Sequence, residues 1–504
     1  MTEPARAEWR ALQHARLRRE LQRLDTVFFL LSAMVVIDTI GAVAIGGAQA
    51  FTWLIVLFTL FFVPSALANA ELGAALPEEG GCYVWVREAF GRFAGALASL
   101  LYWAGTPFWL GGSVVAIAIA VWSRFFGHLG TAGALAFGTA FILVATLAAI
   151  APLRYGKWVP TSGAVGQIVL LSLFTVSTVI YGLAHGVHGI AAGELAPSAA
   201  VFIAVAPVLL YSFVGIELPA SAGEEMVDPR RDIPWAIARA GVCQLALYGI
   251  PVLAVLVVLP ASAVTSVHGL IDAMRTVFTV YGGSVGQDGS VRLAGAGAVL
   301  RSAGAVLFIW VLVASGAAWI MGTGRTQAAA CLDGAGPAFL GRISERTGVP
   351  VIMGTVSGAI SWLAMAIDIR ATGGDSQRYF SAALTVSIAL AVLAYLLIFP
   401  AFLALRIRRP DLERPFRVPG GRLVAWLVAI AATAWSALAT ACLLWPGVGL
   451  ADPDSALPPG FAHDRATFEL LVLAPIGIIA VVAGILWRLG DRTERALAAQ
   501  AEPA

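Results

Sequence analysis

Apolar stretches of about 20 residues recur along almost the whole chain. Each stretch is long enough to cross a hydrocarbon core of about 30 Å as an α-helix. Composition agrees, because the AVILMFWYC set makes up 59% of the 504 residues and the charged DEKR set only 12%. So few charges cannot cover a water-soluble surface, where about a quarter of residues are charged. The sequence therefore predicts an all-α polytopic membrane protein.

Hydropathy and turn residues divide the chain into twelve predicted transmembrane helices. The first six are residues 27–47, 51–75, 93–122, 132–151, 159–183 and 199–222. The second six are residues 233–259, 299–329, 351–367, 380–405, 423–444 and 468–487, and a short amphipathic piece at 83–90 precedes the third helix. The transporter domain therefore spans residues 25–489.

The distribution of basic residues predicts the orientation, because arginine and lysine favour cytoplasmic loops. With both termini inside, 25 of the 32 basic residues fall on inner segments and seven on outer ones. Residues 1–24 then form a cytoplasmic N-terminal segment, without the apolar run of a signal peptide, and residues 490–504 a cytoplasmic tail. We expect a multi-pass protein of the cell membrane, with the lipid bilayer as a partner.

Several classes of function are excluded by charge and by cysteine spacing. The net charge is +2 and Lys157 is the only lysine, so nucleic acid is not an expected partner. The four cysteines lie far apart, without metal-ligand or disulfide spacing. No catalytic or nucleotide-binding motif appears in a suitable context. We expect no enzyme activity, no metal and no cofactor.

Two predicted helices contain residues that interrupt helical structure. Helix 1 contains the glycine-rich run Ile40–Gly47, and helix 6 places Gly215, Glu217 and Pro219 in close succession. Glycine weakens a helix, and proline removes a backbone donor. Interrupted helices in corresponding positions are typical of inverted-repeat transporters with a site near the bilayer midplane. Glycines that merely permit close helix packing are the alternative.

Three motifs carry a resemblance to a known family. They are Glu79–Val86 (EGGCYVWV), Phe213–Glu217 (FVGIE) with Ala222–Pro234 (AGEEMVDPRRDIP), and Trp319–Arg325 (WIMGTGR). Together they resemble motifs of the amino acid, polyamine and organocation (APC) superfamily, and the third resembles its glutamate and GABA exchanger branch. The helix 1 motif G-I-G-S-G-I-F of that family is absent, and the sequence from Asp38 to Gly47 stands in its place.

The resemblance implies a LeuT-like fold of two inverted five-helix repeats, with helices 1 and 6 broken. Helices 1–5 would occupy residues 25–185 and helices 6–10 residues 198–405. Helices 11 and 12, within residues 423–489, would be additions.

A broken helix can bind an amino acid through its backbone, since N-termini offer N–H groups and C-termini carbonyls. We expect the backbone at 41–44 to receive the carboxylate and carbonyls near Tyr211, Ser212 and Val214 to hold the ammonium group. Side chains from helices 3, 8 and 10 would select the substrate. The predicted substrate-binding residues are Asp38, Ile40, Gly41, Ala42, Val43, Ala44, Tyr211, Ser212, Phe213, Val214 and Gly215.

Three side chains are candidates for gating or proton coupling. Asp38 lies 13 residues after Asp25, about 20 Å along a helix, so it should be deep in the membrane, as an amine contact, a proton carrier or a helix cap. Glu217 lies in the helix 6 break, where burial would favour its neutral form or a structural hydrogen bond. The resemblance implies that Tyr211 gates the site, and the alternative is an ordinary packed aromatic.

Other charged groups are interpreted as a gate network or as snorkelling groups rather than substrate ligands. They are Glu71, Glu224, Glu225, Arg230, Arg231 and Asp232.

The expected function is secondary active transport of an amino acid by alternating access. Exchange, or proton coupling through Asp38 or Glu217, is preferred, because Ser315 is the only hydroxyl found near the place in helix 8 where a sodium site would lie. The alternative is a polyamine or organic amine porter in which Asp38 pairs with the amine. A membrane sensor without transport is a third, less favoured hypothesis.

Overall fold

The computed structural model describes residues 3–499 except 36, 41, 42, 44, 45, 188, 259–268, 287–289, 372–375, 459, 462 and 463. Its α-helices before the midpoint are α1 (Glu3–His14), α2 (Arg23–Met34), α4 (Gly47–Leu57), α5 (Val63–Ala75), α6 (Cys82–Phe90), α7 (Arg92–Phe108), α8 (Val115–Phe125), α9 (Thr131–Ile150), α10 (Leu153–Gly156), α11 (Trp158–His185) and α12 (Ala199–Tyr211). The later ones are α13 (Pro229–Val258), α14 (Gly269–Val277), α15 (Gly295–Leu332), α16 (Val351–Ala371), α17 (Ser376–Arg408), α18 (Gly421–Leu444) and α19 (Arg465–Ala499). Strands β1 (Gly283–Val285) and β2 (Val291–Leu293) form an antiparallel hairpin.

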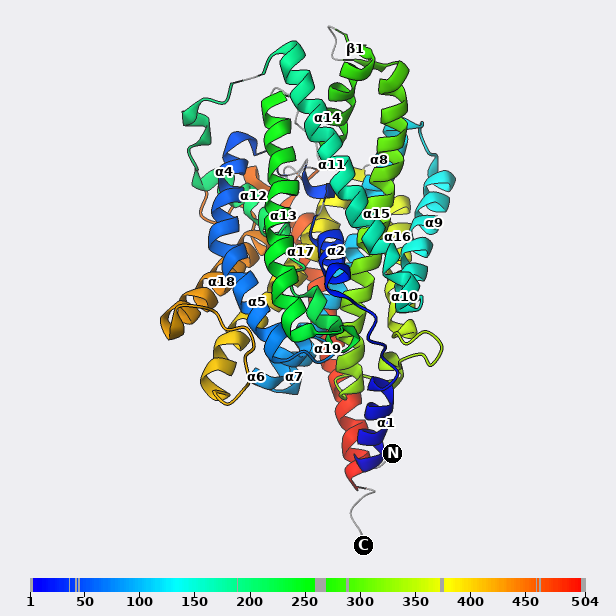
Figure 1. Ribbon diagram of the computed structural model, residues 1–504, viewed down its shortest axis with the longest axis vertical. Helices are drawn as coiled ribbons and strands as arrows, with labels where there is room; N and C mark the ends of the chain where they lie inside the picture. The colour runs from blue at the N-terminus through cyan, green and yellow to red at the C-terminus, as the bar shows by residue number, and fades with distance from the viewer. Residues whose placement is uncertain are drawn as a thin grey trace.

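The helices form a bundle elongated along one axis (Figure 1). Helix α1 and the last turns of α19 lie at one end, which we call the terminal end, together with α6. Helix α14 and strand β1 lie at the opposite end, the hairpin end. The two ends of the chain therefore approach the same side of the bundle, while the assignment of that side to the cytoplasm stays a prediction from the arginines.

Ten helical segments in the described part of the chain are long and apolar enough to cross a membrane. They are Gly47–Ala75, Arg92–Phe125, Thr131–Ile150, Leu153–His185, Pro229–Val258, Gly295–Leu332, Val351–Arg370, Phe380–Arg408, Gly421–Leu444 and Arg465–Gly490. They correspond to ten of the twelve predicted helices. The remaining two, the first and the sixth, are represented by the short helices α2 and α12, of 12 and 13 residues.

Two long segments pass through a π-helical turn where proline or glycine disturbs the regular pattern. Phe58–Phe62 joins α4 to α5 just before Pro64, and Trp109–Val114 joins α7 to α8 just after Pro107. Proline cannot donate to the preceding turn, and a wider turn accommodates the missing bond. Gly111 lies in the second turn, and a Cβ there would come within 2.0 Å of the Ser361 carbonyl oxygen. That glycine therefore permits the backbone of α16 to approach.

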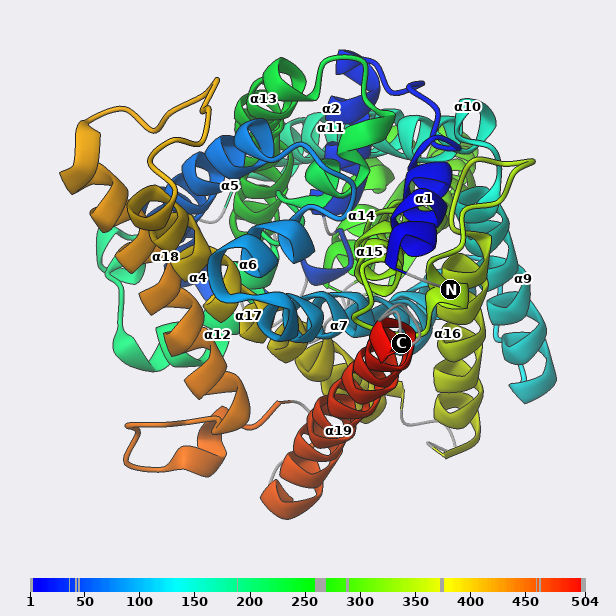
Figure 2. The ribbon, with the colours of Figure 1, turned by 90° about the horizontal axis from the view of Figure 1, so that it is seen from below.

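The long helices differ in how far the bundle covers them. The most apolar stretches of α7–α8 and of α15 are each 78% buried inside the protein, but the corresponding stretch of α19 is only 17% buried. Figure 2 shows α15 near the middle of the bundle, with α9 and α18 at its periphery. Helices α7 and α15 therefore form the interior. The short helix α2 packs against α15, whereas α12 packs against α4 and α18.

Candidate functional site

Helix α12 ends at Tyr211, shortly before Gly215, Glu217 and Pro219, the residues predicted to interrupt helix 6. The next residues make short-range turns, with Val214 N donating to Tyr211 O at 2.9 Å, before a 3₁₀ segment at Leu218–Glu225. Gly215 has a φ of +107°, which disfavours any residue with a side chain. This local conformation explains why the α-helix cannot continue.

Helix α2 ends at Met34, before the glycine run in which the sequence predicted the break. A single 3₁₀ turn follows at Ile37–Thr39, and α4 begins at Gly47, whose φ is +63°. Gly47 therefore starts the second long segment, whereas the sequence assigned it to the end of the first. The interruption begins earlier than predicted because its cause is tertiary, as the contacts of the α2 carbonyls show.

The last carbonyls of α2 are bound by side chains from three other helices. Trp319 Nε1 of α15 donates to Ala33 O at 3.0 Å, and Gln244 Nε2 of α13 donates to Met34 O at 3.0 Å. The carbonyl of the next residue, residue 35, accepts from Nε2 of Gln167 in α11 at 3.0 Å. A helix end leaves such carbonyls without partners, and inside a membrane each must be satisfied by protein. These three side chains supply the partners.

Gln244 also connects the two interrupted helices. The same Nε2 atom donates to Ser212 O, just after the end of α12, at 2.7 Å. Gln244 is fully buried, as is Gln167. Neither glutamine was predicted from the sequence. The sequence feature that could have indicated them is that each is a lone amide side chain in a largely apolar predicted helix. Such a group must find a partner at membrane depth.

Glu217 joins the break after α12 to α17. Tyr395 donates its hydroxyl hydrogen to Glu217 Oε2 at 2.8 Å, and the Gly215 backbone N–H donates to the Tyr395 hydroxyl oxygen at 3.3 Å. Glu217 is only 2% exposed. The hydroxyl of Tyr102 in α7 and the second carboxyl oxygen of Glu217 are buried without a hydrogen bond among the described residues. Tyr395 is therefore the hydroxyl partner of this carboxyl group among the described residues.

Only part of the predicted site in helix 1 can be placed. Gly41, Ala42 and Ala44 lie outside the described residues, and Asp38 is described only by its backbone, in the 3₁₀ turn. Ile40 and Val43 are both fully buried.

The structure describes all of the predicted substrate-binding residues of helix 6, and all of them are buried. Tyr211 is 4% exposed, and Ser212, Phe213 and Val214 are at most 1% exposed. The Ser212 carbonyl that was expected to meet an ammonium group already accepts from Gln244. In this conformation, therefore, the break after α12 is packed by protein.

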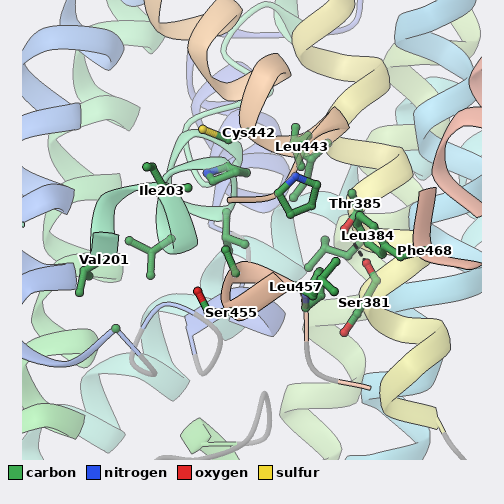
Figure 3. A pocket seen from close by; sticks show the side chains of 18 of the residues that line it. Val201, Ile203, Ser381, Leu384, Thr385, Cys442, Leu443, Ser455, Leu457 and Phe468 are labelled. Carbon is green, nitrogen blue, oxygen red and sulfur yellow. Dashed lines mark hydrogen bonds between the residues drawn. The ribbon is translucent and has the colours of Figure 1, made fainter. Parts of the chain in front are cut away.

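A cavity of about 390 Å³ lies beside α12, and the predicted substrate-binding residues whose side chains the structure describes do not line it. Val201 and Ile203 face it from α12, and Ser381 and Thr385 face it from α17 (Figure 3). Cys442 of α18 adds to a lining that is mostly apolar. Gly46, at the end of the interruption before α4, also lines it, so the cavity adjoins that interruption but not residues 211–215 after α12.

Charged residues of all three sequence motifs meet at the terminal end. Arg325, from the motif in α15, pairs with Glu225 at 2.5 Å and lies 3.7 Å from Glu79. All three side chains are at most 4% exposed. Glu225, which was interpreted from the sequence as a gate-network or snorkelling group, is therefore buried in an ion pair.

Further ion pairs surround this cluster. Glu71 is buried between Arg406 and Arg414, and it also accepts from the backbone N–H of residue 418. Asp333 accepts from Tyr83 at 2.6 Å, and it also accepts from arginines 10 and 87. Because these contacts join α5, α6, α15, α17 and α1, they hold the terminal end closed.

The N-terminal segment covers the same end. His14 Nδ1 lies 2.7 Å from Glu224 Oε2, and the hydrogen bond with Glu224 raises the pKa of His14. Burial acts to raise the pKa of Glu224, but the bond with His14 opposes it and the pKa is lowered. Leu21 forms a parallel bridge with Met226. Residues 3–25 therefore form part of the closure, whereas the sequence predicted residues 1–24 only as a cytoplasmic segment.

Comparison with known proteins identifies the family. A family model described as amino acid permease matches residues 21–458. The chain belongs to the amino acid permease family. It is therefore a multi-pass membrane transporter and not an enzyme, as the sequence predicted.

Two antiporters are similar to parts of this permease. A probable agmatine/putrescine antiporter of Lactococcus lactis is 25% identical over 80% of this chain and 83% of its own length. A glutamate/gamma-aminobutyrate antiporter of the same organism is 22% identical over 56% of this chain and 52% of its own length. The resemblance to the APC superfamily and its glutamate and GABA exchanger branch is thereby confirmed.

Solved structures agree at the level of fold. A manganese transporter of Eremococcus coleocola superposes with a TM-score of 0.59 and 14% identity, covering 94% of each chain. At that identity the likeness concerns the fold alone.

Proposed function

We propose that this permease exchanges a small amino acid across the cell membrane by alternating access. The observation that carries the proposal is the pair of interrupted helices, α2 and α12, whose ends meet at Gln244. Backbone groups at such breaks can bind a zwitterion without charged side chains. In this proposal the closed terminal end faces the cytoplasm, and helices 1–5 and 6–10 form two inverted repeats within a twelve-helix domain.

Substrate binding in this proposal requires a change at the break after α12. The carbonyl of Ser212 is bound to Gln244, and Tyr211 is buried. Opening would move Tyr211 as the gate and free carbonyls near Ser212 and Val214 for the ammonium group. The backbone around residues 41–44 would receive the carboxylate, and Asp38 would lie beside it.

Coupling to protons is assigned to Glu217, with Asp38 as the second candidate. Glu217 bridges the α12 break to Tyr395 on α17, so a change of its charge would act on both elements. A buried ionisable group at membrane depth is costly and is therefore a functional candidate by default. Glu217→Gln would keep the hydrogen bond from Tyr395 and remove the titration.

A second candidate substrate is an organic amine such as agmatine or putrescine. The similarity to the probable agmatine/putrescine antiporter favours it. In this version Asp38 pairs with a cationic nitrogen, and the amino acid carboxylate is not required.

Exchange in proteoliposomes would test the proposal and separate the two candidates. Purified permease is reconstituted in two sets of proteoliposomes, one loaded with labelled amino acids and one with labelled putrescine, and unlabelled amino acids or amines are added outside each. Efflux driven by external amino acids but not by putrescine or agmatine supports the first candidate, and the reverse result supports the second. Binding of a ligand without exchange of any labelled solute would indicate a sensor and refute both.

A further inference from the structure

Glu79 stands apart from the other buried acidic groups of the terminal end. Arg325 donates from Nε and Nη2 to both carboxyl oxygens of Glu225, at 2.5 and 3.2 Å, and from Nη1 to Met321 O at 2.9 Å. Glu79 Oε1 lies 3.7 Å from Nε of Arg325, too far for a hydrogen bond. Neither carboxyl oxygen of Glu79 has a hydrogen-bond partner among the residues that the structure describes, although Glu79 is only 5% exposed.

The charges around Glu79 do not balance if it is ionised. Two buried carboxyl groups, Glu79 and Glu225, face one guanidinium, that of Arg325. On the side of α1, Glu224 accepts from the Glu79 backbone N–H at 3.2 Å and pairs with His14. A buried carboxylate without hydrogen bonds costs several kcal/mol, and a group in that position becomes neutral instead.

We propose that Glu79 is a proton-binding site of the closed terminal end, occupied while Glu225 remains ionised on Arg325. This site is separate from Glu217, and the only part that rests on the proposed function is its consequence for transport. Burial, and then the charge of Glu225, raises the pKa of Glu79 well above its usual range. The direction agrees with the geometry.

Loss of this proton would weaken the closure at a definite place. The segment between α5 and α6 contacts the segment after α12 through Gly80 N, which donates to Ser221 O at 3.0 Å. A negative charge on Glu79 would repel Glu225 and Glu224, both in that second segment, and would compete for Arg325. Proton release would therefore separate the two segments, so that the terminal end opens more readily at alkaline pH.

Thermal unfolding of the purified permease without substrate tests the site. The variant is Glu79→Gln, and the control is its neighbour Glu78→Gln, whose side chain is 52% exposed. Because an acid whose pKa is raised by folding binds its proton more tightly in the folded state, wild-type stability falls as pH rises above about 4.5. We expect Glu79→Gln to abolish this component of the fall between pH 5 and 9, and Glu78→Gln to follow the wild type.

His14 also titrates in this range, and the charge of Glu78 helps to raise its pKa, so both variants are compared on a His14→Gln background, where this contribution is absent. Equal pH slopes for the two variants would overturn the proposal. So would a Glu79→Gln variant that is destabilised at acidic pH relative to Glu78→Gln, because the anion would then be required.

Hydrogen–deuterium exchange of the wild type provides a second measurement that needs no variant. Peptides covering residues 77–82 and 218–227 should exchange faster at pH 8 than at pH 6, after correction for the intrinsic pH dependence of exchange. Corrected exchange that does not change with pH in both peptides would refute the proton site even if Glu79→Gln failed to fold. A failure of the proposed transport function would leave both measurements unaffected.

Discussion

Substitution of Gln244 is the most direct test of how the two interrupted helices are held together. Replacing it with leucine removes two buried hydrogen bonds, to Met34 O and Ser212 O, with little change in side-chain volume. Hydrogen bonds between membrane helices contribute about 0.6 kcal/mol each on average and at most about 1.7, so Gln244→Leu should cost about 1–3 kcal/mol. From per-residue unfolding entropies, a chain of 504 residues loses roughly 1 °C of melting temperature per kcal/mol.

The matched control is Gln167→Leu. Gln167 makes one bond of ordinary length, to the carbonyl of residue 35, and its second contact, with Ser32 O, is 3.5 Å long. It touches α2 but makes no hydrogen bond to the residues after α12. We therefore expect Gln244→Leu to lower the melting temperature about twice as much as Gln167→Leu. We also expect Gln244→Leu to slow exchange in proteoliposomes more strongly than Gln167→Leu does, because only Gln244 makes hydrogen bonds at both breaks.

Equal effects of the two substitutions would refute this reasoning. A Gln244→Leu permease that melts and exchanges like the wild type would refute it as well, because the freed carbonyls would then have no need of that amide.

Three other substitutions test separate parts of the structure. Gly215→Ala places a side chain at a φ of +107° and should cost about 1–3 kcal/mol, measured as a lower melting temperature. His14→Gln removes the bond to Glu224, and its melting temperature should fall below that of the wild type most at pH 5–6.5. The deficit should vanish as pH rises through the raised pKa of His14 and as it falls through the lowered pKa of Glu224. Arg406→Leu removes one of the two arginines that pair with buried Glu71 and leaves Arg414 in place, so it should cost about 1.5–3 kcal/mol, read from the same unfolding experiment.

Each of these substitutions has a control elsewhere in the chain. Gly324→Ala, inside α15 with open space around its Cβ position, should be neutral or stabilising. Arg409→Leu removes a half-exposed partner of Glu88 and should change stability by less than about 1 kcal/mol. His185→Gln replaces an exposed histidine at the end of α11 and should change the melting temperature little. If a control variant changed the melting temperature as much as its test variant does, the corresponding prediction would be contradicted.

The sequence predicted the long helices well because each depends on a local property. Ten predicted segments agree with the observed ones to within a few residues, since about 20 apolar residues suffice to specify a membrane-crossing helix. The break after α12 was also predicted at the right place, because Gly215 and Pro219 act on their own backbone. Hydropathy could not anticipate the π-helical turns, which depend on how neighbouring helices approach.

The charged network was predicted in kind but not in its partners. Glu71 and Glu225 were interpreted as gate groups, and both are buried in ion pairs. The sequence could not show that Arg325, far along the chain, is the partner of Glu225, nor that Glu79 is left without a donor. Such pairings follow from the packing of α15 against the segments after α5 and α12, which no local pattern encodes.

The end of α2 shows why the interruption of helix 1 begins earlier in the chain than the sequence predicted. No proline or glycine occurs between Arg23 and Ile40, so local propensity would let this helix continue. It ends because Trp319, Gln244 and Gln167 bind three successive carbonyls near its end. A break made by donors on other helices can be lost when those donors move, whereas Gly215 favours a break through its own backbone. Any motion that opens the substrate path should therefore change α2 more than the turn after α12, and Gln244 is the side chain through which the two must move together.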